Sequence, residues 1–152
     1  MNQYTVETTD IIPAAPEKVY TVLSDYHTHH PAILPKPAFK GVKVIKGGKG
    51  AGTELQAITN EWGREVVYNL KVSEPEPGRV LFEEDAQKGI ATTFKVEPIN
   101  GGHSRVTISM KRNVVSGWRG ALEKAVNPPL LQMVFKTELK QIADYVKSHP
   151  AL

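Results

Sequence analysis

The feature that most constrains the fold is the order of the expected elements along the chain. A strand-like segment at residues 4–12 is followed by a helix that begins near Pro16, by six further strand-like segments, and by a long apolar helix from Gly117 to about Ser148. Short turns between the strand-like segments favour an antiparallel meander. We therefore expect an α+β fold, with a curved antiparallel sheet of about six or seven strands around a long C-terminal helix. Residues 1–152 are expected to form a single domain.

Proline positions shape both expected helices. Pro16 stands in a first helical turn, where a missing N–H is tolerated, and Val19 and Val22 follow it at helical spacing. Pro128 and Pro129 fall inside the long C-terminal apolar stripe. Because proline removes a helical hydrogen bond and clashes with the preceding turn, we expect a kink or a break there.

Two tryptophans occupy different expected environments. Trp62 precedes Gly63 in a tight turn, which predicts an exposed indole, with closure of a binding site as the alternative. Trp118 follows Ser116, an expected helix N-cap, and we expect its ring to anchor the long helix against the sheet.

Composition narrows the classes of function. The chain has 152 residues, 40% of them hydrophobic, and contains no cysteine, which excludes disulfides, thiol nucleophiles and thiolate metal sites. Its formal charge of +3 is mild and its lysines lack interleaved aromatic residues, so we expect no nucleic-acid binding. The sequence shows no membrane-spanning apolar run and no signal-peptide pattern, so we expect a cytoplasmic protein, monomeric or homodimeric.

Three segments carry a likeness to a known family. They are Ala15–Asp25 after the first strand, Gly50–Leu55 at a strand start, and Glu74–Phe82 across a hairpin. With the C-terminal helix, the chain resembles the polyketide cyclase/dehydrase-like branch of the helix-grip (SRPBCC) superfamily, which includes START-type lipid carriers and the birch-pollen-allergen fold. The resemblance covers nearly the whole chain and implies a sheet that grips the long helix around an apolar cavity. It implies no shared catalytic motif, because one scaffold hosts many functions.

In such a fold, alternating strand residues become candidates for the cavity lining. The alternative is that the same residues fill a solid core. The predicted ligand-binding side chains from the strands and the long helix are Tyr68, Leu70, Phe82, Thr92, Phe94, Ile108, Met110, Met133 and Phe135, with Val66, Val80 and Leu131 as further lining candidates.

Charged residues at two strand ends extend these faces. Arg112 continues the face of Met110, and Glu84 continues that of Phe82. An inward Arg112–Glu84 pair, or either group binding a polar ligand end, is one interpretation. The other places both in water past the strand ends. In both cases Glu83 and Asp85 are expected to be solvated.

The segment His27-Thr28-His29-His30 is the densest cluster of titratable groups. His27 and His30 are included among the predicted ligand-binding residues because the resemblance places this segment beside the cavity mouth. The alternatives are an exposed polar turn and a metal site, but the ligand spacing of known metal motifs is absent, so we predict no metal and no cofactor.

The sequence contains no motif typical of phosphate binding or of nucleophilic catalysis. The run Gly47–Gly52 is followed by Thr53-Glu54 rather than by a phosphate-binding lysine and a helix, so we expect a flexible hairpin. The chain has no Gly-x-Ser-x-Gly nucleophile motif. Acid–base catalysis needs only one or two side chains, and the candidates are Tyr20, Tyr26, His27, Tyr68 and Arg112.

The leading functional hypothesis is reversible binding of a small hydrophobic or amphipathic molecule, of lipid, polyketide, quinone or aromatic type, in an internal cavity. The first alternative is a cyclase, dehydratase or isomerase that acts on such a molecule by acid–base catalysis. The second alternative is a protein-interaction module with a filled core and an exposed apolar patch.

Overall fold

The computed structural model describes residues 2–152, and Met1, the first residue of the predicted domain, lies outside the described residues. The elements follow the expected order, and the proline-rich segment from Thr28 to Pro37, where the sequence predicts a short helix or a turn, contains a short helix. They are β1 (Gln3–Ile12), α1 (Pro16–Ser24), α2 (His29–Ile33), β2 (Phe39–Lys46), β3 (Glu54–Glu61), β4 (Arg64–Glu76), β5 (Val80–Asp85), β6 (Ile90–Ile99), β7 (His103–Asn113) and α3 (Trp118–Ser148).

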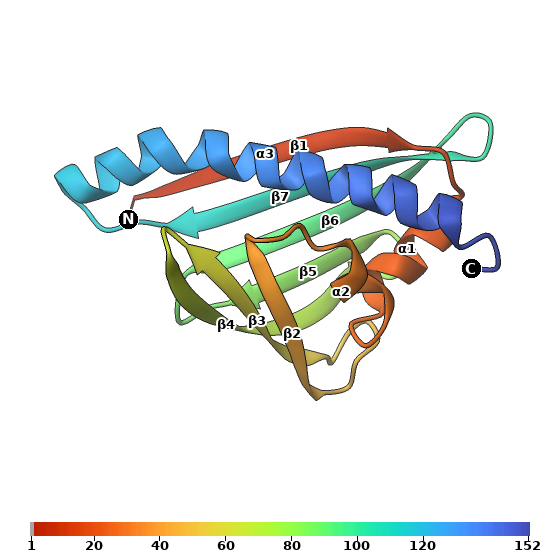
Figure 1. The fold of residues 1–152 in the computed structure, drawn as a ribbon, viewed down its shortest axis with the longest axis horizontal. Coiled ribbons are helices and arrows are strands. Elements are labelled where there is room, and N and C mark those ends of the chain that lie inside the picture. The colour runs from red at the N-terminus through yellow and green to blue at the C-terminus, as the bar shows by residue number, and fades with distance from the viewer. Residues whose placement is uncertain (1) are drawn as a thin grey trace.

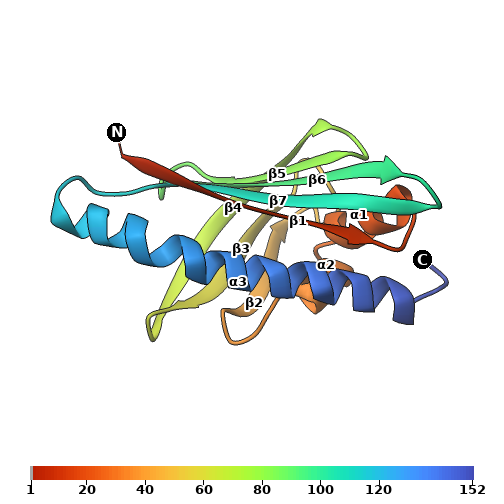
Figure 2. The ribbon, with the colours of Figure 1, turned by 90° about the horizontal axis from the view of Figure 1, so that it is seen from above.

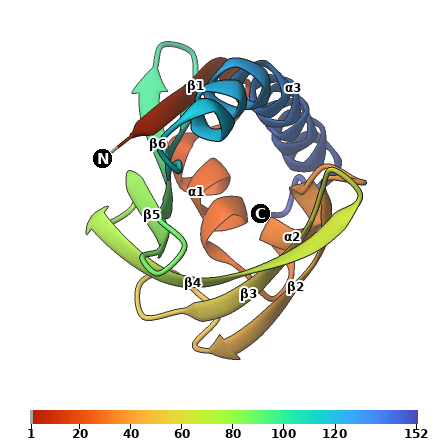
Figure 3. The same ribbon diagram turned by 90° about the vertical axis from the view of Figure 1, so that its left-hand side faces the viewer.

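The seven strands form one antiparallel sheet in the order β1-β7-β6-β5-β4-β3-β2. All pairs except β1–β7 are neighbours in sequence, as expected for a meander. Seen along the sheet, the strands curve around the molecule, with α3 across the open side and α1 and α2 in the gap between (Figure 3). This arrangement confirms the predicted α+β fold, a curved antiparallel sheet that grips a long C-terminal helix.

The core lies between the concave face of the sheet and the helices. Fully buried side chains come from α1 (Val19 and Leu23), from β7 (Ile108) and from the second half of α3 (Leu139 and Ile142). Helix α3 packs most extensively against β1, which Figure 2 shows running beside it. The apolar stripe of α3 therefore meets the sheet over its C-terminal half.

Helix α3 continues through its two prolines. It runs from Trp118 to Ser148 with Pro128 and Pro129 inside it, and it is drawn as one continuous coil (Figure 1). The alternative of a break is therefore wrong, and any bend at this dipeptide does not interrupt the helix. The preceding turn at Lys124 and Ala125 is exposed, so water can hydrate the carbonyl groups that lose their helical donors.

The two tryptophans are both exposed. Trp62 is 71% exposed, which confirms the predicted exposed indole. Trp118 is 73% exposed, so the prediction that it anchors α3 against the sheet is wrong. The N-cap is Gly117 rather than Ser116, and the first turns of α3 project past the end of the sheet, where no strand lies beneath them (Figure 1).

Candidate functional site

A cavity of about 280 Å³ lies between the concave face of the sheet and α3. Its wall comes mainly from apolar side chains of β3, β4, β6 and α3, and residues of α2 and β2 complete it. The interior is therefore not a filled core at this point. The predicted residues that stand on the cavity wall are Tyr68, Leu70, Thr92, Phe94, Met110, Arg112, Leu131, Phe135 and His30.

The predicted inward face of β5 is wrong. Leu81, Glu83 and Asp85 are buried, whereas Phe82 is half-buried and Glu84 is exposed on the outer face. Phe82 lies across from Ser73 on β4, outside the cavity wall. β5 presents Glu83 and Asp85 to the interior because hydrogen-bond donors are available to them there. Asp85, for example, accepts from the backbone N–H of Asn69 at 2.9 Å. The predicted solvation of Glu83 and Asp85 is wrong for the same reason.

Five further predicted residues lie outside the cavity wall, namely Val66, Val80, Ile108, Met133 and His27. Met133 is 65% exposed on the outward face of α3, whereas the next two residues of the helix, Val134 and Phe135, line the cavity. Ile108 is fully buried but packs in the solid part of the core under β7. His27 stands in the turn after α1, beside the β2–β3 loop.

Four polar residues form a cluster at the partly exposed end of the cavity, here called the rim polar cluster. They are Glu61, Tyr68, Arg112 and Glu123. Arg112 contacts Glu61 Oε1 through Nη2 at 3.2 Å and Glu123 Oε1 through Nε at 3.4 Å. The Tyr68 hydroxyl donates to Glu61 Oε2 at 2.5 Å. The predicted Arg112–Glu84 pair is therefore wrong: Arg112 faces inward as expected, but its partners come from the end of β3 and from α3.

Burial and the Glu61 hydrogen bond raise the pKa of Tyr68 above its ordinary value. The phenol therefore keeps its proton at neutral pH. Trp62 follows Glu61 and also stands on the cavity wall, so its exposed indole adjoins the rim polar cluster. The mouth thus combines a large aromatic surface with a fixed set of charges.

A second group of polar residues is buried, and it is here called the deep polar cluster. Its members are Tyr26, His30, Glu83 and Glu138. The Tyr26 hydroxyl donates to Glu83 Oε1 at 2.6 Å, and His30 Nε2 lies 3.9 Å from the same oxygen. His30 stacks on the Tyr26 ring, and its Nδ1 lies 2.6 Å from the Leu23 carbonyl oxygen. All four members line the cavity and are at most 7% exposed.

Glu138 is the most isolated member of this cluster. It is 1% exposed, and its Oε2 has no hydrogen-bond partner among residues 2–152. Loss of hydration raises the pKa of the Glu138 carboxyl well above its ordinary value, and the nearby Glu83 raises it further. Burial likewise raises the pKa of Tyr26, with Glu83 as the second cause. Glu138 therefore retains its proton under conditions where an exposed glutamate has lost it.

The sequence interpretation missed Glu61, Glu83 and Glu138 as site residues. A signal existed for Glu138, which falls between Phe135 and Leu139 on the apolar stripe of α3. An acidic residue at a core-facing position of a helix marks a special environment. Glu61 contacts Arg112, which lies 51 residues away in the chain, and Glu83 accepts from Tyr26, which lies 57 residues away, so the local sequence pattern gave no signal for these pairs.

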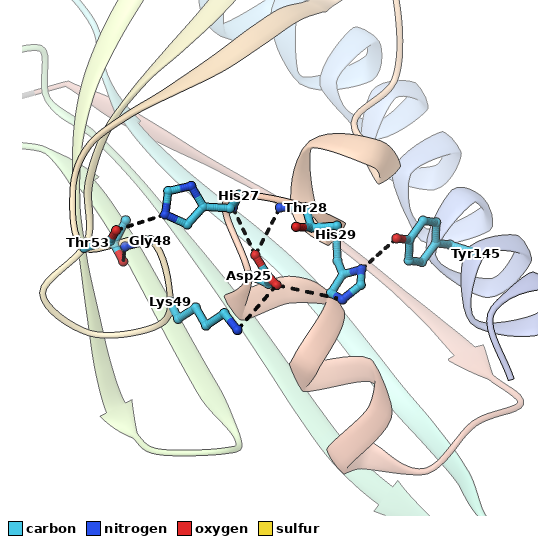
Figure 4. A network of polar contacts seen from close by, with 9 residues as sticks. Asp25, His27, Thr28, His29, Gly48, Lys49, Thr53 and Tyr145 are labelled. Atoms are coloured by element: carbon cyan, nitrogen blue, oxygen red, sulfur yellow. Dashed lines mark hydrogen bonds and ion pairs between the residues drawn. The ribbon is translucent and has the colours of Figure 1, made fainter. Parts of the chain in front are cut away.

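The histidine segment belongs mostly to a structural network at the side of the cavity (Figure 4). Asp25 Oδ1 accepts the backbone N–H groups of His27 and Thr28, each at 3.0 Å. His29 Nδ1 lies 2.7 Å from the Tyr145 hydroxyl on α3, and Asp25 Oδ2 lies 4.0 Å from Lys49 Nζ. The network thus joins the turn after α1, the β2–β3 loop and α3, and of the three histidines only His30 stands on the cavity wall.

Residues 2–152 contain neither a metal-binding cluster nor a membrane-spanning helix. These residues contain no group of three or more His, Asp or Glu side chains arranged to hold a metal ion. Within the same range, no helix is both long enough and apolar enough to cross a membrane.

Known proteins share this architecture. The chain is 27% identical to KanY protein, whose solution structure superposes with a TM-score of 0.82 over 97% of this chain and 99% of that one. A START superfamily protein from Mycobacterium smegmatis is 17% identical, with a TM-score of 0.73 over 95% and 97% of the two chains. Norcoclaurine synthase from Thalictrum flavum, solved with dopamine and hydroxybenzaldehyde, is 19% identical, with a TM-score of 0.70 over 97% and 88%. No curated protein matches in sequence.

The curved sheet, the gripped helix and the cavity between them together define a helix-grip protein. Residues 3–147 match the family described as polyketide cyclase / dehydrase and lipid transport, and the chain belongs to that family. This membership confirms the resemblance seen in the sequence and supports ligand binding as the general class of function.

Proposed function

We propose that the protein reversibly binds a small, largely apolar molecule in the cavity between the sheet and α3. The observation that carries the proposal is the cavity of about 280 Å³, whose wall is mainly apolar and includes members of the rim and deep polar clusters. Burial of an apolar ligand surface there supplies affinity at about 25 cal/mol per Å². The rim and deep polar clusters set the orientation, as a few polar groups do in most small-molecule sites.

The distribution of charge favours a neutral ligand. Arg112, the one arginine on the cavity wall of the described chain, is already paired with Glu61 and Glu123. The deep polar cluster contains two acidic residues. A ligand carboxylate would therefore displace existing ion pairs at the rim or meet acidic groups at depth. Neutral quinone, polyketide or aromatic compounds avoid both costs.

The experiment is a fluorescence titration with N-phenyl-1-naphthylamine, a neutral dye that brightens in apolar surroundings. Leu131→Trp places an indole in the cavity, whereas Met133→Trp adds the same indole to the outward face of the same helix. We expect Leu131→Trp to weaken dye binding by about tenfold or more, a loss of at least ~1.4 kcal/mol. Met133→Trp should bind like the unmodified protein.

Circular dichroism of both variants provides the control for folding. Equal binding by Leu131→Trp and the unmodified protein would contradict the proposal. A loss in Met133→Trp alone would place the dye on the outward face of α3, where Trp118, Leu122 and Met133 are exposed. That result would instead favour the interaction-module alternative.

Acid–base catalysis on the bound molecule is the second candidate function, and the deep polar cluster favours it. A buried carboxylic acid that retains its proton is a suitable general acid, and Tyr26 stands beside it. Of the other catalytic candidates, Tyr20 is hydrogen-bonded to Glu74 outside the cavity. A catalytic role predicts that Glu138→Gln abolishes turnover of a substrate while leaving its binding within about twofold.

A further inference from the structure

The buried carboxyl group of Glu138 has an oxygen for which the described protein supplies no hydrogen-bond partner. Its side chain is 1% exposed and lines the cavity, and Glu83 is near enough to influence its charge. Buried polar atoms in native proteins nearly always have a partner, and an orphaned one calls for an explanation. In a cavity that takes a small molecule, a polar atom of that molecule is the natural partner.

The neighbours of Glu138 determine which chemical form it presents. The Tyr26 hydroxyl already donates to Glu83 Oε1 at 2.6 Å, and His30 Nδ1 lies 2.6 Å from the Leu23 carbonyl oxygen, so these nearby groups have other partners. A negative charge on Glu138 would have no compensating partner among the side chains of this cluster. A protonated carboxyl offers one O–H donor together with acceptor capacity.

We infer that Glu138 is a specificity-determining residue that donates a hydrogen bond to a neutral acceptor oxygen, such as a ketone or quinone carbonyl, at the buried end of the ligand. This inference rests on the proposed function and deepens it by naming the ligand chemistry. The apolar body of the ligand would lie along Phe94 and Phe135, with Glu138 in contact with its oxygen. A ligand with a carboxylate at that end would bring an unpaired negative charge out of water and next to Glu83.

The test compares three probes of similar shape: 2-acetylnaphthalene, which has a carbonyl acceptor, 2-ethylnaphthalene, which has none, and 2-naphthoate, which is anionic. Titrations are followed by naphthalene fluorescence at pH 7. The unmodified protein should bind the ketone about 3- to 10-fold more tightly than the hydrocarbon, the range expected for one neutral hydrogen bond. It should bind 2-naphthoate more weakly than the ketone.

Variants at position 138 separate the hydrogen bond from cavity shape. Glu138→Leu should remove the preference for the ketone without weakening the hydrocarbon, because leucine fills similar space without a donor. Glu138→Gln should keep part of the preference, because its amide N–H₂ is a donor. An unchanged ketone preference in Glu138→Leu, or equal binding of ketone and hydrocarbon by the unmodified protein, would overturn the inference while leaving the proposed function intact. Failure of the unmodified protein to bind any of the probes would instead count against the proposed function.

A measurement on the unmodified protein covers the case in which the variants do not fold. Carboxyl ¹³C NMR of glutamate-labelled protein should show one resonance at the position of a protonated acid at pH 7, and that resonance should shift on addition of 2-acetylnaphthalene. If every glutamate resonance has the position of an ionised carboxylate at pH 7, the inference is wrong.

Discussion

At the scale of single residues, Glu138 is an acidic residue on the apolar stripe of α3, and its buried surroundings raise the pKa of its carboxyl group. Its neighbours Leu139 and Ile142 on α3 bury ordinary apolar side chains against the sheet. Glu138 points instead to the end of the cavity that Tyr26 and Glu83 occupy. The cost of burying a carboxyl group is smallest when the group is neutral, so the structure itself selects the protonated form.

Glu138→Gln should change the pH dependence of stability. The folded-state pKa of Glu138 is raised, so the folded protein holds this proton at pH values where the unfolded chain has released it. The free energy of unfolding therefore falls as pH rises from the unfolded pKa of about 4.3 towards the folded pKa, by about 1.4 kcal/mol per pH unit at most. Glutamine does not titrate, so the free energy of unfolding of Glu138→Gln should not show this decrease with rising pH.

Urea unfolding of both proteins across this pH range tests the prediction. The stability of Glu138→Gln relative to the unmodified protein should increase as pH rises. Glu84→Gln is the matched control, because Glu84 is exposed on the outer face of β5, and its stability difference should stay nearly constant. A pH-independent difference for Glu138→Gln would show that the carboxyl ionises normally in the folded state.

At the scale of elements, the β2–β3 loop owes its conformation to a close approach by the turn after α1. Gly48 has φ +139, and a Cβ atom added there would lie 2.0 Å from the His27 ring nitrogen Nε2. His27 Nε2 also lies 3.1 Å from the Gly47 carbonyl oxygen (Figure 4). The imidazole therefore packs directly on loop backbone, which accounts for its position outside the cavity.

Gly48→Ala should destabilise the protein more than Gly52→Ala. Both positions have positive φ, which costs alanine about 1 kcal/mol or more, but a Cβ at Gly52 meets nothing within 4 Å. The additional loss of unfolding free energy in Gly48→Ala, compared with Gly52→Ala, therefore measures the steric conflict with His27. Thermal or urea unfolding gives the difference, and His27→Ala in the Gly48→Ala background should remove most of it. Equal effects of the two alanine substitutions would contradict this account of the loop.

The strands show which element faces could be predicted from the sequence. On β4 and β6 one face is clearly the more apolar, and Tyr68, Leu70 and Phe94 face inward as the alternation predicts. On β5 both faces carry large apolar residues, so alternation alone favours the wrong one. The deciding contact is the hydrogen bond from Tyr26 to Glu83, which joins positions 57 residues apart. Such a long-range contact leaves no trace in local periodicity.

At the scale of the whole molecule, the order of elements was sufficient to predict the fold. A meander followed by one long apolar helix has few ways to bury both apolar surfaces, and the helix-grip arrangement is one that does so. The presence of a cavity is a different matter. It depends on how far the curved sheet stands from α3 and on which side chains fill the gap, neither of which the strand pattern specifies.

The exposed residues of α3 provide the main competing location for an apolar ligand. Trp118, Leu122 and Met133, which do not line the cavity, are each more than half exposed in the part of α3 that precedes its buried half. An apolar molecule that binds there would also produce a fluorescence signal or a thermal shift. Affinity alone therefore does not test the central claim, which concerns where the ligand lies.

The most direct test is the location of a bound neutral ligand by intermolecular nuclear Overhauser effects, with N-phenyl-1-naphthylamine and methyl-labelled protein. The account predicts contacts from the dye to methyl groups of Leu55, Leu70 and Met110, which line the cavity from three different strands. Contacts confined to Leu122 and Met133, on the outward face of α3, would contradict it.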